Sequence, residues 1–390
     1  MTRALRAEPA GPGDVDALTG ALRAALDRQG PAVLPVAPGA GPVRALSAER
    51  VPDDVALVVA TSGSTGAPRD VMLSAAALRA SAAATDARLG GPAQWLLALP
   101  AHHVAGVQVV VRSLLAGTRP VVLRATDGGF RPDGFAAGTA ALTGERRYVS
   151  LVPTQLHRLL DHDAGRAALL TYDAVLLGGA ATPPALLERA RSAGARVVTT
   201  YGMSETCGGC VYDGSALDGV RVRLGADGTV LLAGPVLATG YLGRPDLDRA
   251  TFTRDEGVRW LRTNDLGRLE GGLLTVVGRA DDVLVTGGVK VAPAGVERVV
   301  AGLDGVGEVC VVGVPDPEWG QAVVAVVVPR GGAAPPTVAQ VRSAVAATLG
   351  APAAPRHVVA VDRLPLRGPG KVDRRGVLAL AAARLGRQST

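Results

Sequence analysis

Thr61-Ser-Gly-Ser-Thr-Gly-Ala-Pro-Arg69 directly follows a short apolar run, Val55-Ala-Leu-Val-Val-Ala60. The β-branched apolar run predicts a buried strand. The glycines and hydroxyls after it predict a loop that can hold phosphate oxygens with backbone N–H groups and side-chain donors. The Walker A spacing of glycine and lysine is absent, and a tight turn between a strand and a helix stays open as the alternative. Ser74 is the expected N-cap of a helix that continues to about Arg88.

Strands and helices alternate on both sides of this loop, which predicts an α/β fold with a mostly parallel sheet. We expect strands at 55–60, 95–99, 120–123, 148–152, 175–177 and 197–200, and helices at 74–88, 104–115, 183–193, 338–349 and 376–387. Residues 221–277 have short alternating runs with turn pairs, which predicts a β-rich subdomain. We therefore expect a large N-terminal domain of layered subdomains (1–278) and a small, mobile α+β C-terminal domain (279–390).

The bulk composition narrows the class of partner. The chain has 390 residues, a net charge of +6 and arginines that are dispersed along its length. Nucleic-acid binding predicts clustered basic residues with aromatics between them, so we expect small anionic substrates instead. No apolar run approaches the roughly 18 residues of a membrane span. The three cysteines and the absence of an apolar leader favour a reducing, cytoplasmic location.

A second motif, Tyr201-Gly-Met-Ser-Glu-Thr206, follows the expected strand at 197–200. Ligands of α/β proteins bind at the carboxyl ends of strands. Tyr201 offers a face for stacking, Glu205 a hard oxygen ligand for a cation, and Thr206 a hydroxyl. A turn whose glutamate is satisfied internally is the alternative.

Three further motifs lie toward the C-terminus. Thr263-Asn-Asp-Leu-Gly267 and Gly278-Arg-Ala-Asp-Asp282 place an acid and an arginine near the expected domain junction, where they suit ribose hydroxyls and a hinge. Gly368-Pro-Gly-Lys-Val-Asp-Arg374 places Lys371 in a loop. The sequence has two lysines, Lys290 and Lys371, against 39 arginines. A retained lysine favours a place that a forked guanidinium does not fit, although a solvated lysine is the alternative.

These motifs, in this order, are similar to those of the acyl-adenylate-forming superfamily, which includes acyl-CoA synthetases, peptide-synthetase adenylation domains and luciferases. The resemblance covers residues 55–374. It implies an ATP-dependent acid–thiol ligase: a carboxylate attacks the α-phosphate of ATP, and a thiolate, here coenzyme A, displaces AMP. It also implies Mg²⁺ and a rotation of the small domain between the two steps.

The resemblance assigns roles to single positions. The implied nucleotide-binding residues are Thr61, Ser62, Gly63, Ser64, Thr65, Gly66, Arg69, Gly178, Gly179, Ala180, Tyr201, Gly202, Thr206, Asp265 and Arg279. The implied catalytic residues are Lys371 and His103; His103, Arg112 and Ser204 would contact the acid, Gly287 and Gly288 coenzyme A, Glu205 Mg²⁺, and Asp281 would be the hinge.

The stretch from His103 to Gly117 resembles the branch that activates an aromatic dicarboxylate for menaquinone synthesis. Arg112 would pair the carboxylate that does not react, with a structural arginine as the alternative. A ligase for another acid, including one that loads a carrier protein, stays open. So does a homologue that binds nucleotide without turnover.

Several features depart from the superfamily. The loop ends in Arg69-Asp70 where Lys-Gly is usual, and an acid near phosphates is unfavourable unless it points away or pairs with a cation. The region before the loop is short. Cys207-Gly-Gly-Cys210 could be a redox pair or half of a zinc site, but it overlaps the nucleotide motif, and we expect ordinary buried thiols. A homodimer is an open possibility that no residue pattern supports.

Overall fold

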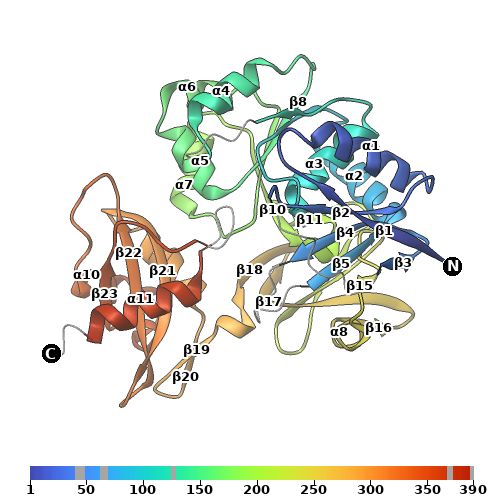
Figure 1. The fold of residues 1–390 in the computed structure, drawn as a ribbon. Coiled ribbons are helices and arrows are strands. Elements are labelled where there is room, and N and C mark those ends of the chain that lie inside the picture. The colour runs from blue at the N-terminus through green and yellow to red at the C-terminus, as the bar shows by residue number, and fades with distance from the viewer. Residues whose placement is uncertain (40–48, 62–68, 124–128, 367–371, 387–390) are drawn as a thin grey trace.

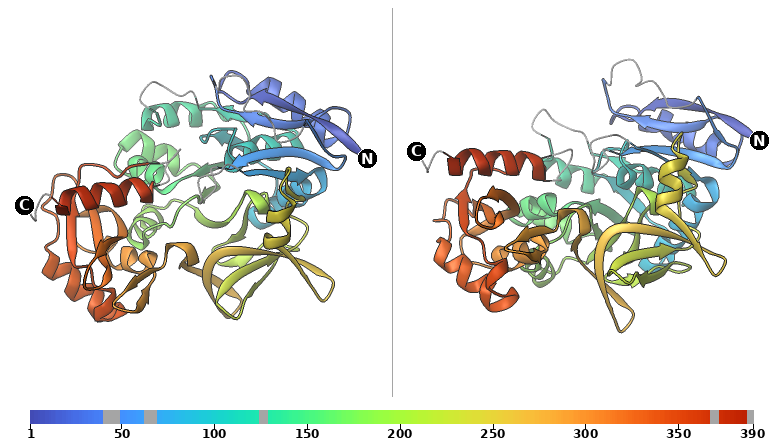
Figure 2. Two further views of the ribbon diagram at one scale, coloured as in Figure 1. Left: turned by 60° about the horizontal axis from the view of Figure 1, so that its bottom comes forward. Right: turned by 90° about the horizontal axis from the view of Figure 1, so that it is seen from below.

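The computed structural model describes residues 1–39, 49–61, 69–123, 129–366 and 372–386. It has a large N-terminal part and a small C-terminal part (Figure 1). The views in Figure 2 place the first strand, β1, and the last helix, α11, at opposite ends of the molecule. No helix among the described residues combines the length and apolarity that crossing a bilayer requires.

A seven-stranded sheet forms the centre of the large part, in the order β12-β11-β10-β9-β8-β6-β7. Its strands are β6 (Gln94–Leu97), β7 (Val121–Val122), β8 (Arg147–Leu151), β9 (Ala174–Leu177), β10 (Val197–Met203), β11 (Gly208–Tyr212) and β12 (Ser215–Ala216). Strands β6 to β10 are parallel, and β11 and β12 run antiparallel. Successive residues such as Leu176 and Leu177 belong to different cores, because side chains alternate across a strand.

Helices cover both faces of this sheet. The first face packs against α2 (Ala75–Leu89) and α3 (Val104–Leu115). The second packs against α4 (Pro132–Ala140), α5 (Pro153–Leu160), α6 (Asp163–Leu169) and α7 (Pro184–Ser192). Burial on both faces explains why the strands read as continuous apolar runs.

A six-stranded sheet, β15-β5-β4-β2-β1-β3, is the second layer. It contains β1 (Thr2–Pro9), β2 (Ala32–Val36), β3 (Arg50–Pro52), β4 (Val55–Thr61), β5 (Arg69–Ser74) and β15 (Gly240–Tyr241). Helix α1 (Val15–Leu26) shares one core with α2, α3 and residues of both sheets. The helices α1 to α3 therefore pack between the two sheets.

The structure corrects one expectation about the phosphate loop. Residues 62–68 lie outside the described residues, but the segments on either side form an antiparallel pair in which Thr61 is opposite Arg69. The loop therefore joins two antiparallel strands rather than a strand and a helix. The predicted helix does start after Ser74, whose hydroxyl accepts from the Ala77 N–H at 3.1 Å. The missed strand, 69–74, begins with two charged residues, which hid its apolar pattern.

The predicted β-rich region is confirmed. It contains β13 (Arg221–Leu224), β14 (Thr229–Ala233), β16 (Phe252–Asp255), β17 (Val258–Glu270) and β18 (Leu273–Arg279), with α8 (Pro245–Thr251) before β16. The turns at 226–228 and 270–272 connect antiparallel neighbours as expected.

The small part is an α+β unit with cores of its own. It contains β19 (Leu284–Thr286), β20 (Val289–Val291), α9 (Pro293–Ala301), β21 (Val306–Asp316), β22 (Gly320–Pro329), α10 (Val338–Leu349), β23 (His357–Ala360) and α11 (Arg374–Gly386). Helices α9 and α10 pack on one face of β21-β22-β23, and α11 packs on the other. Short 3-10 helices are η1 (Ser204–Thr206), η2 (Ala280–Asp282) and η3 (Ala351–Ala353). The predicted boundary, between residues 278 and 279, falls one residue before the end of β18, where Arg279 still pairs with Asp265 of β17. We therefore assign Arg279 to the large part and propose the junction at η2.

Two helical glycines allow a matched test of how tightly α3 packs. A Cβ at Gly106 would lie 2.1 Å from the Pro100 carbonyl oxygen, whereas one at Gly20 in α1 would meet nothing within 4 Å. We expect Gly106→Ala to lower the unfolding free energy by about 1–3 kcal/mol, because backbone must move. Gly20→Ala should raise the unfolding free energy by about 0.5–1 kcal/mol, because glycine destabilises a helix interior relative to alanine. Urea unfolding of both variants measures the difference; equal effects would contradict the close packing.

Candidate active site

The two ends of the predicted phosphate loop are held together. The Thr61 hydroxyl donates to the Arg69 carbonyl oxygen at 3.2 Å. The Arg69 guanidinium carbon lies 6.0 Å from the centre of the Tyr241 ring. The predicted ligands Ser62, Gly63, Ser64, Thr65 and Gly66 lie outside the described residues.

Asp70 lies on the opposite side of its strand from Arg69. Val71, the residue after it, belongs to the core between the two sheets, whereas Met72 belongs to a separate core on the outer face. Alternation along β5 therefore places Arg69 with Val71, and Asp70 with Met72. The acid that departs from the superfamily pattern is buried and points away from the face that carries Arg69.

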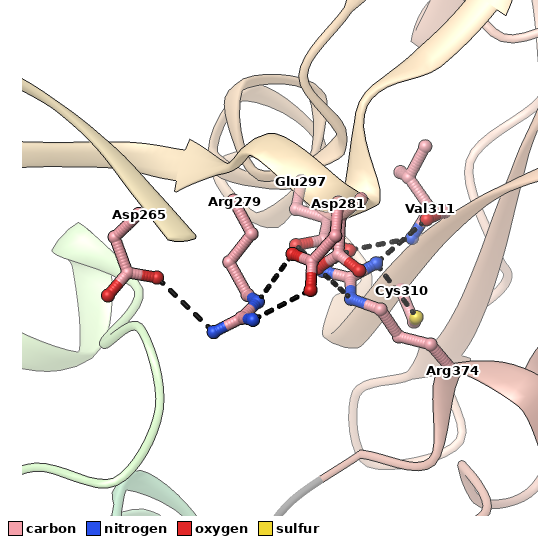
Figure 3. A network of polar contacts seen from close by, with 8 residues as sticks. Asp265, Arg279, Asp281, Glu297, Cys310, Val311 and Arg374 are labelled. Carbon is pink, nitrogen blue, oxygen red and sulfur yellow. Dashed lines mark hydrogen bonds and ion pairs between the residues drawn. The ribbon is translucent and has the colours of Figure 1, made fainter. Parts of the chain in front are cut away.

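A chain of polar contacts connects the second motif to the domain junction. The Tyr201 hydroxyl, at the end of β10, donates to Asp265 Oδ2 at 2.7 Å. Asp265 Oδ1 lies 3.4 Å from Arg279 Nη1, and Arg279 also binds both carboxylate oxygens of Asp281, at 2.9 and 2.8 Å. Figure 3 shows Arg279 between the two carboxylates. The structure thus brings together four of the predicted residues, from β10, β17, β18 and η2.

Burial and the neighbouring charges shift the pKa values of Asp265, Tyr201 and Asp281. Burial raises the pKa of Asp265, although the Tyr201 hydroxyl and the Arg279 charge act in the opposite direction. Burial and the neighbouring Asp265 raise the pKa of Tyr201, so its hydroxyl keeps its proton. The pKa of Asp281 is lowered, because binding to Arg279 outweighs an opposing effect of burial. Asp265 therefore presents a carboxylate, fixed by a neutral phenol, to hydroxyl donors of a ligand.

Glu205 lies in the 3-10 turn η1 and has a partner that the sequence did not reveal. The Tyr241 hydroxyl donates to Glu205 Oε1 at 2.7 Å. Tyr241 thus contacts Glu205 through its hydroxyl and lies near Arg69 through its ring. A single carboxylate suits Mg²⁺, which takes one or two protein carboxylates and completes its octahedron with phosphates and water. Glu205 therefore fits the expected ion.

Thr206 is used inside the turn. Its side chain is fully buried, and its hydroxyl accepts from the Met203 N–H at 2.9 Å and donates to the Gly208 carbonyl oxygen at 2.7 Å. In this conformation the Thr206 hydroxyl shapes the turn and has no face for a nucleotide. Ser204 is also buried, and its carbonyl oxygen accepts from the Cys207 N–H.

Gln108 anchors the same turn and was missed by the sequence analysis. Its side-chain amide donates to the Cys207 carbonyl oxygen at 2.6 Å, and the Ser81 hydroxyl donates to the same oxygen at 3.3 Å. Cys207 has a φ of +54°, an uncommon conformation for a residue with a side chain. A lone glutamine in the apolar stretch 104–111 was the available signal. Cys207 and Cys210 are both buried free thiols, as predicted.

The predicted glycines at the strand ends have steric reasons of their own. A Cβ at Gly178 would lie 2.4 Å from the Thr200 hydroxyl oxygen, and one at Gly202 would lie 2.0 Å from the Gly208 carbonyl oxygen. Gly179 has a φ of +82°, and both Gly179 and Ala180 are exposed after β9. The close approach of β9, β10 and β11 therefore requires glycines where a nucleotide site was expected.

The structure separates His103 and Arg112, two of the three residues predicted to contact the acid. His103 is the extended N-cap residue of α3, and its ring lies 4.3 Å from that of His102. Arg112 is nine residues further on, which is about 13 Å along the helix and about two and a half turns, on the opposite side. Its side chain is 4% exposed and lies 5.3 Å from the Trp95 ring. The structure therefore places Arg112 in the core, on the opposite side of α3 from His103, and its contact with the acid stays a prediction.

Two predicted segments lie in the small part. Gly287 and Gly288 form the turn between β19 and β20 with φ values of +53° and +78°. The Trp319 ring covers Gly287, where a Cβ would lie 2.7 Å from a ring carbon. Lys371 lies outside the described residues; the residues that flank its loop, Leu366 and Val372, form an antiparallel bridge.

The raised pKa of Asp265 predicts a pH dependence of stability. The folded protein holds this proton to higher pH than the unfolded chain does. The unfolding free energy that Asp265 contributes is therefore highest at low pH and falls as the pH rises through the folded pKa. We expect this fall to be absent in Asp265→Asn. Urea unfolding from about pH 3 to pH 7 measures it, with the exposed Asp304→Asn as the control; an unchanged slope in Asp265→Asn would contradict the assignment.

Comparison with known proteins agrees with this geometry. Residues 15–242 match the AMP-binding enzyme family, and residues 295–371 match the AMP-binding enzyme C-terminal domain. A probable 2-succinylbenzoate–CoA ligase of Mycobacterium tuberculosis is 48% identical over 329 residues, which is 84% of each chain.

Solved structures show the same fold. The o-succinylbenzoate CoA synthetase of Bacillus subtilis, in complex with an acyl-adenylate intermediate, aligns with a TM-score of 0.70 and 27% identity over 85% of this chain and 70% of that one. The amide bond synthetase McbA of Marinactinospora thermotolerans aligns with a TM-score of 0.76 and 27% identity over 97% of this chain and 80% of that one. The chain belongs to the AMP-binding enzyme family.

Proposed function

We propose that this chain is an AMP-forming acid–CoA ligase that activates 2-succinylbenzoate with ATP and transfers the acyl group to coenzyme A. The relative that is 48% identical along 84% of both chains is the observation that carries the acid substrate. The described site supplies the support for the nucleotide: a buried carboxylate, an aromatic ring and a metal-competent glutamate at one edge of the central sheet.

The first step joins two anions, so positioning and electrostatics dominate it. A carboxylate oxygen of the acid attacks the α-phosphorus, and the bond to pyrophosphate breaks. Arg69 and the loop before it would hold the departing phosphates, while Asp265 accepts hydrogen bonds from the ribose hydroxyls. Glu205 would hold Mg²⁺, which neutralises phosphate charge. Lys371 would supply a compact positive charge at the forming bond.

The second step transfers the acyl group. The thiolate of coenzyme A attacks the acyl carbon, and AMP leaves with the electron pair of the broken bond. The turn at Gly287 and Gly288 would line the approach of the thiol after the small domain rotates about the proposed hinge at Asp281. The Trp319 ring keeps this turn in place by packing over Gly287.

The proposed activity has a direct assay. With ATP, Mg²⁺ and coenzyme A, we expect thioester and AMP from 2-succinylbenzoate and not from benzoate or a medium-chain fatty acid. Lys371→Ala should lower the adenylation rate at least about a hundredfold, because it removes a charge that acts at the forming bond. Pyrophosphate exchange with another acid would keep the family chemistry and contradict the substrate.

Two further outcomes separate the alternatives. Acyl transfer to a carrier protein but not to free coenzyme A would replace the ligase by a carrier-loading enzyme. Nucleotide binding without exchange for any acid would favour a non-catalytic homologue, and Arg69→Lys combined with Asp70→Gly would then test whether the altered loop is the cause.

Arg112 allows a test of what the buried cation does. We expect Arg112→Ala to lower the unfolding free energy by about 1–3 kcal/mol, because it leaves a gap against Trp95. The KM for the acid should change less than about twofold, because a core arginine would make no contact with the acid. Loss of a contact worth about 1.4 kcal/mol would instead change the KM about tenfold. Steady-state kinetics beside urea unfolding measures both. A large rise in KM with unchanged stability would restore Arg112 as a substrate ligand.

A further inference from the structure

Two adjacent aspartates at the domain junction bind arginines from different parts of the chain. Asp281 is bound through both oxygens by Arg279, at the end of β18 in the large part. Asp282 lies 3.2 Å from Nε of Arg374, the first residue of α11 in the small part. Figure 3 shows the two arginines on either side of the junction. On one side of the peptide bond between residues 281 and 282, the aspartate binds an arginine of the large part. On the other side, the aspartate binds an arginine of the small part.

Arg374 uses every nitrogen of its guanidinium group. Besides Asp282, it binds Glu297 of α9 at 2.9 Å and donates to the Val311 carbonyl oxygen of β21 at 2.9 Å. Glu297 also accepts from the Val311 N–H at 2.8 Å. These groups are partly buried, and a planar fork suits several fixed acceptors at once better than the point charge of lysine does. The start of α11 is therefore fixed to α9, to β21 and to η2 together.

The segment before Arg374 is fixed in the same region. The Asp373 N–H donates to the Pro365 carbonyl oxygen at 2.8 Å, and Leu366 pairs with Val372. In the sequence, Lys371 precedes Arg374 by three residues. Any shift of residues 372–374 relative to the junction is passed along the chain to the segment that carries the proposed catalytic lysine.

We propose that Arg374 is a positioning residue for adenylation: by binding Asp282 and Glu297 it fixes the segment before α11 to the domain junction. This inference rests on the proposed function. The proposal gives Asp281 and Asp282 different roles. Asp281 stays with the large part through Arg279, Asp282 turns with the small part through Arg374, and rotation is confined to the backbone between them. Because transfer to the thiol does not use Lys371, losing the Arg374 contact should affect the first step selectively.

Asp282→Asn is the decisive variant, since it keeps the size of the side chain and leaves Glu297 in place. We expect its rate of ATP–pyrophosphate exchange to fall about tenfold, because small misplacements of a catalytic group are costly. The KM for ATP should stay within about threefold of wild type. Thioester formation from preformed acyl-adenylate and coenzyme A should be close to that of wild type.

Two arginine variants and two controls accompany it. Arg374→Lys keeps one charge and should lose less exchange activity than Arg374→Ala, which itself risks loosening α11. The controls are Asp304→Asn, an exposed acid, and Arg330→Ala, an exposed arginine, both of the same part; both should catalyse ATP–pyrophosphate exchange like wild type. An equal fall in both steps with a lower melting temperature would overturn the proposal and leave a stabilising contact only. Unchanged exchange in Asp282→Asn would also overturn it.

Amide hydrogen exchange provides a reading that needs no substrate. If Asp282 fixes this segment, exchange at Asp373 and Val377, whose N–H groups bind Pro365 and Asp373, should be faster in Asp282→Asn than in Asp304→Asn. Unchanged protection would overturn the proposal even if the acid substrate is correct. Conversely, wild-type protein that activates no acid would refute the proposed function, while protection at Asp373 would still decide whether Asp282 fixes the segment.

Discussion

The site depends on the contacts of the Asp265 carboxylate. Tyr201 donates a hydrogen bond to one of its oxygens, and Arg279 lies near the other. Tyr201 belongs to the central sheet, whereas Asp265 and Arg279 come from the β-rich sheet. A buried carboxylate is costly without partners, so the two sheets must meet where the phenol and the guanidinium can both reach it. Arg279 then binds Asp281, which extends this constraint to the domain junction. One acid thus connects β10 of the central sheet, through Arg279, to the domain junction.

A parallel constraint organises the metal side of the site. Glu205 lies in η1, directly after β10 of the central sheet, Arg69 begins β5 of the second sheet, and Tyr241 contacts both of them. Tyr241 lies on β15, which pairs with β5 directly beyond the phosphate loop. The Tyr241 hydroxyl donates to the Glu205 carboxylate while its ring lies near the Arg69 guanidinium, so one side chain contacts both groups. The alternation along β5 that turns Arg69 inward also turns Asp70 outward, which explains how this chain accommodates an acid beside the loop.

Local pattern predicted the elements, and the order of motifs predicted the family. Helices 104–115 and 338–349 were placed to the residue, because each has a clear apolar period between distinct ends. Strand β5 was missed because it begins with Arg69 and Asp70. The packing of Arg112 against Trp95 was not predicted, because Trp95 belongs to a different element of the chain. Partners such as Tyr241 and Gln108 could not be predicted, since each acts through a contact between segments distant in the chain. The glycines at 178 and 202 fit a nucleotide motif and a steric need equally well, and only the close approach of the strands reveals the second reason.

Under the proposed function, the junction would combine rotation of the small domain with fixed placement of the reactive groups. A flexible linker at the hinge would allow the small part many orientations, and only a few of these would place its residues at the reacting groups. Here Asp281 and Asp282 are each bound by an arginine, so the residues that can change conformation are few. Arg279 is restrained by Asp265, and Arg374 is restrained by Glu297 and Val311. Asp265 and Asp281 therefore share Arg279 as a common partner, and under the proposed function a ligand that binds Asp265 would act on the hinge through a single guanidinium group.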